Sequence, residues 1–449
     1  MVDIKMPMPV EFALSRLHSN GYEAYIVGGC VRDSIMGIQP HDWDICTSAL
    51  PEQVQEIFKD LKVIPTGLQH GTVTVVFEDG DCKQCLEITT YRIDGEYKDN
   101  RHPENVKFVS DLSLDLMRRD FTINAMAYND KEGIIDMFGG VEDIEMGCLR
   151  CVGNPDDRFQ EDALRIMRAI RFAIRYDLQI DDEVIKSIQK NKILLKNVSV
   201  ERICAELTKI LESNFGNDGS KKNRIELIGY LIDFLQVVLD YKIDFDEQEV
   251  YNRLAFVEPN VPLRLAILFD TTNIMNILKD LRFSNDVVFA AHAIREYGHK
   301  ILDDKDKWSS KSSIAAAVNN LHIGDREYNV EDDSSLRYYA RRSLKNIHSC
   351  SFESIISFAK AYVNDEYMFV ALNILQKQMQ FCKENDVYCL QYLAVNGNDI
   401  MQAGFEGKDI GNILNKLLDM VMREDVRNNR EELLAAVSKF RQGEINNEL

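Results

Sequence analysis

The chain has 449 residues, of which 45% are hydrophobic and 28% charged, and its formal net charge is −20 at pH 7. This length exceeds one ordinary core and predicts roughly two to four domains, while the composition is that of a globular protein and excludes disorder on a large scale. The negative charge excludes a uniformly basic surface for nucleic acid, because phosphate contacts need Lys and Arg, but it leaves room for a local basic strip.

Ten cysteines include two CxxC pairs, Cys82 with Cys85 and Cys148 with Cys151. The first pair falls in the polar turn of a predicted hairpin, and a strand at the second pair would point its two thiols to opposite faces. The long gap between the pairs fits no common zinc module, so we expect free thiols. We expect a cytoplasmic protein, because free thiols suit a reducing compartment. The sequence also shows neither a secretory signal nor a run of roughly 18 apolar residues that could span a membrane.

The first elements surround a pair of aspartates. Helical spacing of apolar residues predicts a helix over residues 9–19, and residues 25–49 then form a short apolar strand, two glycines, a helix and a second strand. The second strand carries Asp42 and Asp44. Because strand side chains alternate between faces, we expect these two carboxylates to project from the same face.

The two glycines before this helix, Gly28 and Gly29, let the backbone approach a ligand closely. The N-terminus of the helix favours an anion there. The spacing therefore suits a polyphosphate that divalent cations bridge to the two aspartates. The alternative is an ordinary strand, turn and helix whose aspartates are a solvated strand end.

Residues 50–58 predict a helix with proline in its first turn, and residues 66–77 and 86–92 predict strands of the same sheet. Glu87 lies between apolar neighbours on the last of these strands, where an acid is unexpected. A third carboxylate on the metal side explains it, and a strand-end glutamate that faces water explains it equally well.

Residues 94–117 are polar and lack periodicity in their first half, which predicts a long loop. Arg118, Arg119 and Asp120 follow this loop and precede an apolar run over residues 121–128. We expect this run to form a helix, with Asp120 and Thr122 available as caps. The elements up to about residue 150 together predict an α/β or α+β unit.

Residues 153–180 have the pattern of one amphipathic helix. Its apolar side is a predicted buried stripe of Ile166, Met167, Ile170, Ala173 and Ile174. Its basic side carries Arg165, Arg168, Arg171 and Arg175. Asp162 lies one turn before Arg165, so we expect the two to pair as a fixed acceptor and donor set. The alternative is a surface helix with an ion pair and a solvated basic face.

The pattern of the sequence after residue 198 predicts helices, and we find no further catalytic motif there. A helix over residues 199–214 repeats its apolar positions every four residues. Further helices are predicted over residues 224–239, 262–270, 277–283, 354–363, 369–382, 410–422 and 430–440.

Several segments in a fixed order resemble one known family. They are GGCVRDSIMG, HDWDICTSA, TGLQHGTVTVVF, LEITTYR, RRDFTINAMAY, FGGVEDIEMGCLRCVGNP, RFQEDALRIMRAIRF and ERICAELTKIL. Together they resemble the bacterial-type (class II) tRNA nucleotidyltransferase and poly(A) polymerase family, densely over residues 22–212. A later segment, NGNDIMQAGFEGKDIGNILNKLLDMV, resembles the tail of CCA-adding enzymes.

This resemblance implies an α+β fold with a polymerase-β-like nucleotidyltransferase head and an all-helical remainder. The head would span residues 1–147 and the neck, with a nucleotide-selecting helix, residues 148–215. The body would span residues 216–330 and a tRNA-binding tail residues 331–449.

The resemblance also implies roles at the opening motif. By the family pattern Asp42 and Asp44 bind two Mg²⁺ ions, which activate the 3′-hydroxyl of the primer and steady the departing pyrophosphate. Gly28, Gly29 and Arg32 would hold the triphosphate. The family does not assign Glu87, whose place among the catalytic carboxylates is our inference from the residues.

Two later motifs would contact the nucleotide itself. Arg119 and Asp120 match the RRD motif that contacts the incoming nucleotide, with Arg118 beside them. Asp162 and Arg165 match the EDxxR motif, whose acid and guanidinium read the base edge, and Arg168 and Arg171 line the same helix. Such a pair can serve cytosine and adenine while it lacks the arrangement that guanine needs.

The implied activity is template-independent addition of C, C and A from CTP and ATP to the 3′ end of tRNA, with no DNA or membrane partner. Poly(A) polymerases usually carry a basic Gly-Arg-Arg-like segment where this chain has PTGLQHGTV, and CC-adding enzymes lack part of the loop DGEYKDNRHPENVKF. Polyadenylation and partial CC or A addition are alternatives. A non-catalytic RNA-binding protein is a more remote alternative, against which the intact aspartates of the motifs speak.

One segment departs from the family. Many relatives carry an HD phosphohydrolase motif in the body, whereas this chain reads LRLAILFDTTN at residues 263–273. Phe269 stands where the metal-binding histidine would be, so we expect no phosphohydrolase activity.

Overall fold

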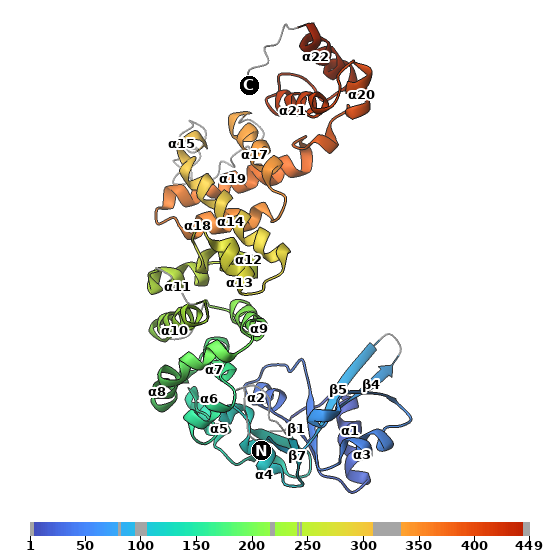
Figure 1. Ribbon diagram of the computed structural model, residues 1–449, viewed down its shortest axis with the longest axis vertical. Coiled ribbons are helices and arrows are strands. Elements are labelled where there is room, and N and C mark those ends of the chain that lie inside the picture. Colours follow the sequence, from blue (N-terminus) through green and yellow to red (C-terminus); the bar gives the residue numbers. More distant parts are fainter. Residues whose placement is uncertain are drawn as a thin grey trace, which may run out of the picture. The chain divides into compact units, whose positions relative to one another are not determined.

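The computed structural model describes residues 4–79, 82–94, 106–215, 221–239, 242, 245–308 and 334–442 (Figure 1). The chain divides into two compact units, Met1–Tyr251 with Asp280–Arg282, and Asn252–Lys279 with Phe283–Leu449. Within the described ranges, none of the helices has the length and apolar character needed to cross a membrane.

The first unit begins with an α+β part built on one mixed sheet (Figure 1). Its helices are α1 (Met8–Ser19), α2 (Gly29–Ile35), α3 (Pro51–Ile57), α4 (Leu112–Met117) and α5 (Gly140–Met146). The strands are β1 (Ala24–Val27), β2 (Asp44–Thr47), β3 (Lys62–Gly67), β4 (Thr72–Asp79), β5 (Cys82–Thr90), β8 (Met126–Asn129) and β9 (Gly133–Asp136). They are ordered β3-β4-β5-β2-β1-β8-β9, and only the β2–β5 pair is parallel. Strands β6 (Arg92–Asp94) and β7 (Val106–Phe108) form a separate antiparallel pair.

Alternation along β1 separates two cores. Ala24 and Ile26 belong to a large cluster that includes apolar residues of α1, α2 and α3, while Tyr25 and Val27 belong to a smaller cluster with Leu112 and Leu116 of α4. Each face of the sheet is therefore covered by apolar side chains. Helix α4 leads directly into Arg118 and Arg119, which line the cavity of the candidate active site.

Helices complete the first unit. They are α6 (Pro155–Glu161), α7 (Leu164–Tyr176), α8 (Asp182–Asn191), α9 (Val200–Leu211) and α10 (Lys221–Leu239). The two-residue strands β10 (Cys148–Leu149) and β11 (Gln179–Ile180) pair in parallel. The predicted apolar stripe of α7 is buried in full, from Ile166 at 0% exposure to Ile174 at 1%.

The second unit is helical in its described residues. Its helices are α12 (Val261–Leu268), α13 (Ile274–Asp280), α14 (Asn285–Asp303), α15 (Lys305–Trp308), α17 (Ser334–Asn346), α18 (Phe352–Ala361), α19 (Glu366–Asn385), α20 (Gly397–Gln402), α21 (Lys408–Met422) and α22 (Arg430–Gln442). Helix α11 (Glu247–Phe256) carries the boundary between the units. Residues from Leu393 to Val437 form a hydrophobic cluster of their own.

The predicted α+β head and helical remainder are confirmed, and several local predictions are wrong. The predicted loop over residues 94–117 contains β7 and α4 in its second half, while residues 95–105 lie outside the described part. The expected helix over residues 121–128 is instead a 3₁₀ turn, Thr122–Asn124, followed by β8. An apolar run this short fits a strand as well as a helix, and β8 is stabilised by pairing with β1.

Three further predictions need correction. The predicted strand over residues 66–77 is the end of β3, a 3₁₀ turn and then β4. The pair Cys82 and Cys85 lies on strand β5 and not in a turn. Those cysteine side chains that the structure describes are free thiols. The single helix predicted over residues 153–180 breaks at Asp162, where φ is −144° and ψ is 102°.

Helix α14 was not predicted, and its Gly298 shows why its sequence is a weak signal. Glycine in a helix interior is unfavourable by propensity. A Cβ at Gly298 would lie 2.3 Å from the Phe358 ring of α18, so close packing of the two helices requires this glycine. A tertiary contact here overrides local propensity.

Candidate active site

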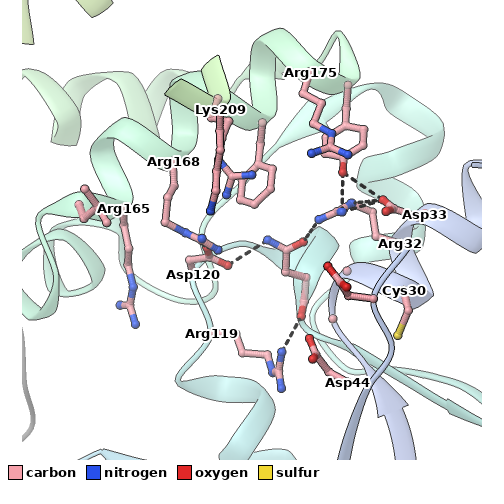
Figure 2. Close-up of a pocket in the computed structure, with 18 of the residues that line it drawn as sticks. Cys30, Arg32, Asp33, Asp44, Arg119, Asp120, Arg165, Arg168, Arg175 and Lys209 are labelled. Atoms are coloured by element: carbon pink, nitrogen blue, oxygen red, sulfur yellow. Dashed lines mark hydrogen bonds and ion pairs between the residues drawn. The ribbon is translucent and has the colours of Figure 1, made fainter. Parts of the chain in front are cut away.

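A cavity of about 750 Å³ in the first unit gathers most of the predicted site (Figure 2). Of the predicted residues, it is lined by Gly28, Gly29, Arg32, Asp42, Asp44, Arg118, Arg119, Asp120, Asp162, Arg165, Arg168 and Arg171. Glu87 is not among the lining residues. Segments more than a hundred residues apart thus meet around one space, although each motif was recognised separately in the sequence.

The glycine turn between β1 and α2 forms one wall. Gly28 has φ +79° and ψ −122°, which L side chains rarely adopt. A Cβ at Gly28 would also lie 2.8 Å from Nη1 of Arg119, whereas a Cβ at Gly29 would make only ordinary contact. The turn therefore needs glycine at the first position, both for the backbone angle and for the arginine beside it.

The two aspartates lie at the start of β2. Buried Trp43 separates them, with 5% exposure, while Asp42 and Asp44 are exposed and line the cavity. Asp42 lies just before β2 and Asp44 is its first residue, so the alternation puts both carboxylates on the same side, as predicted. Glu87 on β5 is the register partner of Asp44 and is also exposed.

These neighbours change the charge balance at Asp44. Partial removal from water raises the pKa of Asp44, Arg119 lowers it, and the negative charges of Glu87 and Asp42 raise it again, with a net rise. Within the described chain, neither Asp42 nor Asp44 takes part in an ion pair through its side chain. The edge of β2 thus presents negative charge to the cavity that Arg119 offsets only in part.

The arginines of the RRD motif are held from behind by Asp115 of α4. Arg118 donates to Asp115 Oδ1 at 2.8 Å through Nη2, and Arg119 donates to Oδ2 at 3.3 Å. Asp115 is 1% exposed. Burial raises the pKa of Asp115, but the two arginines lower it by a larger amount, so the net shift of this pKa is downward. A buried carboxylate therefore fixes both guanidinium groups at the cavity.

Asp120 faces α7. Arg168 donates to Asp120 Oδ2 through Nε at 2.7 Å and Nη2 at 2.5 Å, and the two side chains point toward one another in Figure 2. Burial raises the pKa of Asp120, but Arg168, the hydrogen bond from Asn124 and the charge of Arg165 bring it well below its usual range. Asp120 is therefore an anion at the centre of a cationic wall.

The predicted pair between Asp162 and Arg165 is absent from the interactions of the described residues. Asp162 pairs with Arg202 of α9, at 2.7 Å from Nη2 to Oδ2, and Arg165 pairs with Glu161 at 2.5 Å. The prediction assumed one continuous helix through both residues. The helix breaks at Asp162, whose carboxylate instead accepts from the backbone N–H of Leu164 at 3.1 Å and pairs with Arg202, so it does not meet the guanidinium of Arg165.

The other arginines of α7 differ in their surroundings. Arg171 is 7% exposed, and its Nε donates to Glu206 of α9 at 2.6 Å. Arg168 is half-buried and Arg175 is exposed, so the alternative of a solvated basic face fits only the end of the helix. Arg175, which belongs to the predicted basic side but not to the predicted site, also lines the cavity, as does Lys209 of α9 (Figure 2).

The guanidinium of Arg32 is more buried, and has more partners within the protein, than is needed for an arginine that only binds a phosphate. It is 6% exposed, donates to Asp33 Oδ1 at 2.8 and 2.6 Å and to the Tyr176 hydroxyl at 2.5 Å, and its guanidinium lies 4.3 Å from the Tyr176 ring centre. Its Nη1 donates to Asn124 Oδ1. These bonds fix Arg32 between α2, α7 and the RRD segment.

Sequence reasoning missed the residues that orient the predicted ones. They are Asp33, Asp115, Asn124, Glu161, Tyr176, Arg202 and Glu206. Asn124 stands inside RRDFTINAMAY, and Arg202 and Glu206 inside ERICAELTKIL, so the segments were noticed but not these positions. Pairing across the fold has no local signal.

The divergent HD segment lies in the second unit. Phe269 is fully buried, and Oδ1 of Asp270 lies 2.8 Å from Arg295 Nε and 2.8 Å from His299 Nε2. Across the described residues of the whole chain, no three His, Cys, Asp or Glu side chains are grouped to hold one metal ion. The expected lack of phosphohydrolase activity stays a prediction.

Comparisons with known proteins agree over the whole chain. Residues 24–150 match a family model described as the poly A polymerase head domain, and residues 177–221 match one described as a probable RNA and SrmB-binding site of polymerase A. The CCA-adding enzyme of Ligilactobacillus salivarius is 32% identical and covers 98% of this chain and 97% of its own length. The CCA-adding enzyme of Pediococcus pentosaceus is 30% identical, with 96% and 99% covered.

A solved structure is similar over the same extent. The crystal structure of Bacillus stearothermophilus CCA-adding enzyme in complex with CTP matches with a TM-score of 0.73 at 26% identity, and it covers 98% of this chain and 99% of that one. Sequence and fold therefore agree along nearly the full length, including the helical second unit. The chain belongs to the family of CCA-adding enzymes, which are nucleotidyltransferases.

Proposed function

We propose that this chain adds C, C and A to the 3′ end of tRNA, with CTP and ATP as substrates and no template. The observation that carries the proposal is the full-length similarity to CCA-adding enzymes, at 32% identity, combined with a cavity that joins an acidic strand edge to an arginine-lined helix. Negative charge on one wall and positive charge on the other suit the transfer of a nucleotide from a triphosphate.

Asp42 and Asp44 fit a divalent cation. Their carboxylates line the cavity without ion-pair partners among the described residues. Partial removal from water and the acidic neighbours raise the pKa of Asp44 against the opposing Arg119, so a nearby cation would favour its charged form. Two Mg²⁺ ions held there would supply Lewis-acid activation of the primer hydroxyl and charge for the departing pyrophosphate. Glu87 is the register partner of Asp44 but does not line the cavity, and its role as a third carboxylate stays a prediction.

The remaining residues bind and orient. The turn at Gly28 and Gly29, with Arg32 behind it, would receive the triphosphate, and Arg118, Arg119 and Asp120 would contact the nucleotide. Asp162 and Arg165 would read the base edge once they exchange their present partners, Arg202 and Glu161. Arg168 supports this wall through Asp120, and Arg171 through Glu206.

We further propose the division into head (1–147), neck (148–215), body (216–330) and tail (331–449), with tRNA contacted by shape and phosphate, as an enzyme that serves all tRNAs requires. The separate hydrophobic cluster from Leu393 to Val437 supports a distinct tail. The free thiols of the described cysteines fit the reducing cytoplasm, where we place the protein.

The test is incubation of the purified chain with Mg²⁺, CTP, ATP and a tRNA that ends before CCA. We expect addition of three nucleotides followed by arrest. An open-ended A tail would indicate a poly(A) polymerase, and addition of only CC or only A would indicate a partial enzyme. A lack of any incorporation, with tRNA binding retained, would favour the non-catalytic alternative.

A further inference from the structure

Asn124 ends the 3₁₀ turn that follows the RRD motif, and its side chain bridges two charged residues of the cavity. It is 6% exposed and lines the cavity. Its Oδ1 accepts a hydrogen bond from Arg32 Nη1, and its Nδ2 donates to Asp120 Oδ1 at 3.1 Å. Its backbone carbonyl accepts from Arg119 Nη1 at 3.5 Å. Dashed lines mark these contacts in Figure 2.

The chemistry of the two partners dictates what can stand between them. Arg32 has only donors, and the ionised carboxylate of Asp120 has only acceptors. A bridge must therefore accept at one end and donate at the other, which the amide of asparagine does in one orientation only. With oxygen and nitrogen exchanged, both contacts would be repulsive.

The bridge continues on both sides. Arg32 is fixed on its other side by Asp33 and Tyr176, and the second oxygen of Asp120 is held by Arg168 of α7. A line of hydrogen bonds thus runs from α2, next to the glycine turn, through Asn124 to the helix that carries Arg165 and Arg168. Asn124 is the uncharged link between the two charged groups, Arg32 and Asp120.

We propose that Asn124 is a positioning residue that holds Arg32 and Asp120 in register, so that the phosphate end and the base end of the cavity bind one nucleotide as a unit. This inference rests on the proposed function. It predicts that loss of the bridge weakens nucleotide use by misplacing Asp120 and Arg32, although Asn124 itself performs no chemical step.

The variant Asn124→Asp tests the donor end of the bridge. It keeps the size of the side chain and the acceptor for Arg32, but it places a second carboxylate against Asp120. Two carboxylates this close cannot both ionise readily, so one gains a proton as the pH falls and again donates a hydrogen bond. Asn124→Leu has neither donor nor acceptor at any pH.

The measurement is kcat/KM for CTP with Mg²⁺ and tRNA at pH 8 and pH 6, each divided by the wild-type value at the same pH. For Asn124→Asp we expect a loss of about tenfold to a hundredfold at pH 8, most of it recovered at pH 6. Asn124→Leu should show a loss of similar size at both values. A deficit of Asn124→Asp that does not change with pH, or wild-type kcat/KM in both variants, would overturn the proposal.

Asn129→Asp is the matched control. Asn129 is 1% exposed on β8, and its Nδ2 donates to the Ala24 carbonyl at 3.3 Å, outside the cavity. It should show no pH-dependent change in relative kcat/KM, and the same recovery there would also overturn the proposal. If wild-type chain itself extends no tRNA, the proposed function has failed, which is distinct from wild-type extension with an unaffected Asn124→Asp.

A second variant covers the case in which Asn124→Asp does not fold. Asn124→Ser keeps a hydroxyl that both accepts and donates but is too short to span Arg32 and Asp120. We expect it to lower kcat/KM for CTP about tenfold while its melting temperature stays close to that of the wild type. Wild-type kcat/KM in this variant would contradict the inference.

Discussion

Asp120 in the first unit and Asp386 in the second are both buried carboxylates held by arginine. Arg168 donates to Asp120 at 2.5 and 2.7 Å, while Arg337 and Arg341 donate to Asp386 at 2.8 and 2.7 Å through their Nε atoms. Burial raises the pKa of each carboxyl group and the arginines lower it by more, to about 2 for Asp386. Locally, the two ion pairs use the same chemistry.

Their surroundings separate them. Asp120 and Arg168 line a cavity of about 750 Å³, so a ligand can reach them. In contrast, Arg341 also donates to the carbonyl of Met422 at 2.7 Å and pairs with Glu424 at 3.0 Å, which ties α17 to the end of α21. The comparison teaches that a buried carboxylate paired with arginine contributes to a binding site when a cavity adjoins it, and to the stability of the fold when none does. Substitution of Asp120 should therefore affect activity, and substitution of Asp386 should affect stability.

The largest expected effect is on activity, at the cavity. Asp44→Ala should lower nucleotide incorporation by about a thousandfold or more, because the cation proposed there would stabilise the transition state by several kcal/mol. The folded stability of the variant should not fall, because partial removal from water and the acidic neighbours, opposed by Arg119, raise the pKa of Asp44 and so make its charged form unfavourable in the folded state. Primer extension measures the loss of incorporation, and thermal melting measures the folded stability. Incorporation within tenfold of wild type would refute the assignment of Asp44.

The next effect is on stability, in the second unit. Asp386→Ala leaves two arginines without their carboxylate and should lower the unfolding free energy by about 3 kcal/mol. The chain has two tryptophans, so in a Trp43→Phe background the fluorescence of buried Trp308 follows the second unit during denaturant titration.

The control for Asp386→Ala is Glu56→Ala, in the same background. Glu56 pairs with Lys59 on the surface, with side chains 72% and 69% exposed, so no measurable change is expected. If Asp386→Ala were as stable as this control, the structural role of the arginine pair would be wrong.

A pH series sharpens the same contrast. The folded pKa of Asp386 lies below its usual value, so its stabilisation is present above about pH 4 and is lost as the pH falls toward 2. The difference in unfolding free energy between wild type and Asp386→Ala should therefore shrink by about 2 kcal/mol between pH 4 and pH 2. Denaturant titrations at each pH measure it, and a constant difference would contradict the pKa direction.

The smallest effect concerns selection of the base. Arg165→Ala should lower discrimination of CTP and ATP against GTP and UTP by about tenfold, with less effect on incorporation of CTP itself. The measurement is kcat/KM for each nucleotide with the same tRNA. Arg165 also donates to the carbonyls of Arg158 and Arg118, both at 3.0 Å, so melting curves must accompany the kinetics. Full fidelity in the variant would remove Arg165 from base reading.

Much of the first unit was predictable because its signals are local. The alternation around Trp43 put Asp42 and Asp44 on one face, and the helical period of α7 identified its buried stripe. The apolar run after Asp120 was misread, because its choice between helix and strand depends on pairing with β1. The expected pair of Asp162 and Arg165 failed because one residue in an extended conformation redirects a side chain.

The sequence by itself determined the family, the α+β head followed by helices, and the motif residues that line the cavity, since each is encoded in a short stretch of residue types and spacings. Only the tertiary structure decided the partners: Asp115 behind Arg118 and Arg119, and Asn124 between Arg32 and Asp120. Hydrogen bonds and ion pairs act over a few ångströms between residues that the chain brings together from distant positions. A periodicity in the sequence carries no record of such a meeting, so these orienting residues are visible only in the folded chain.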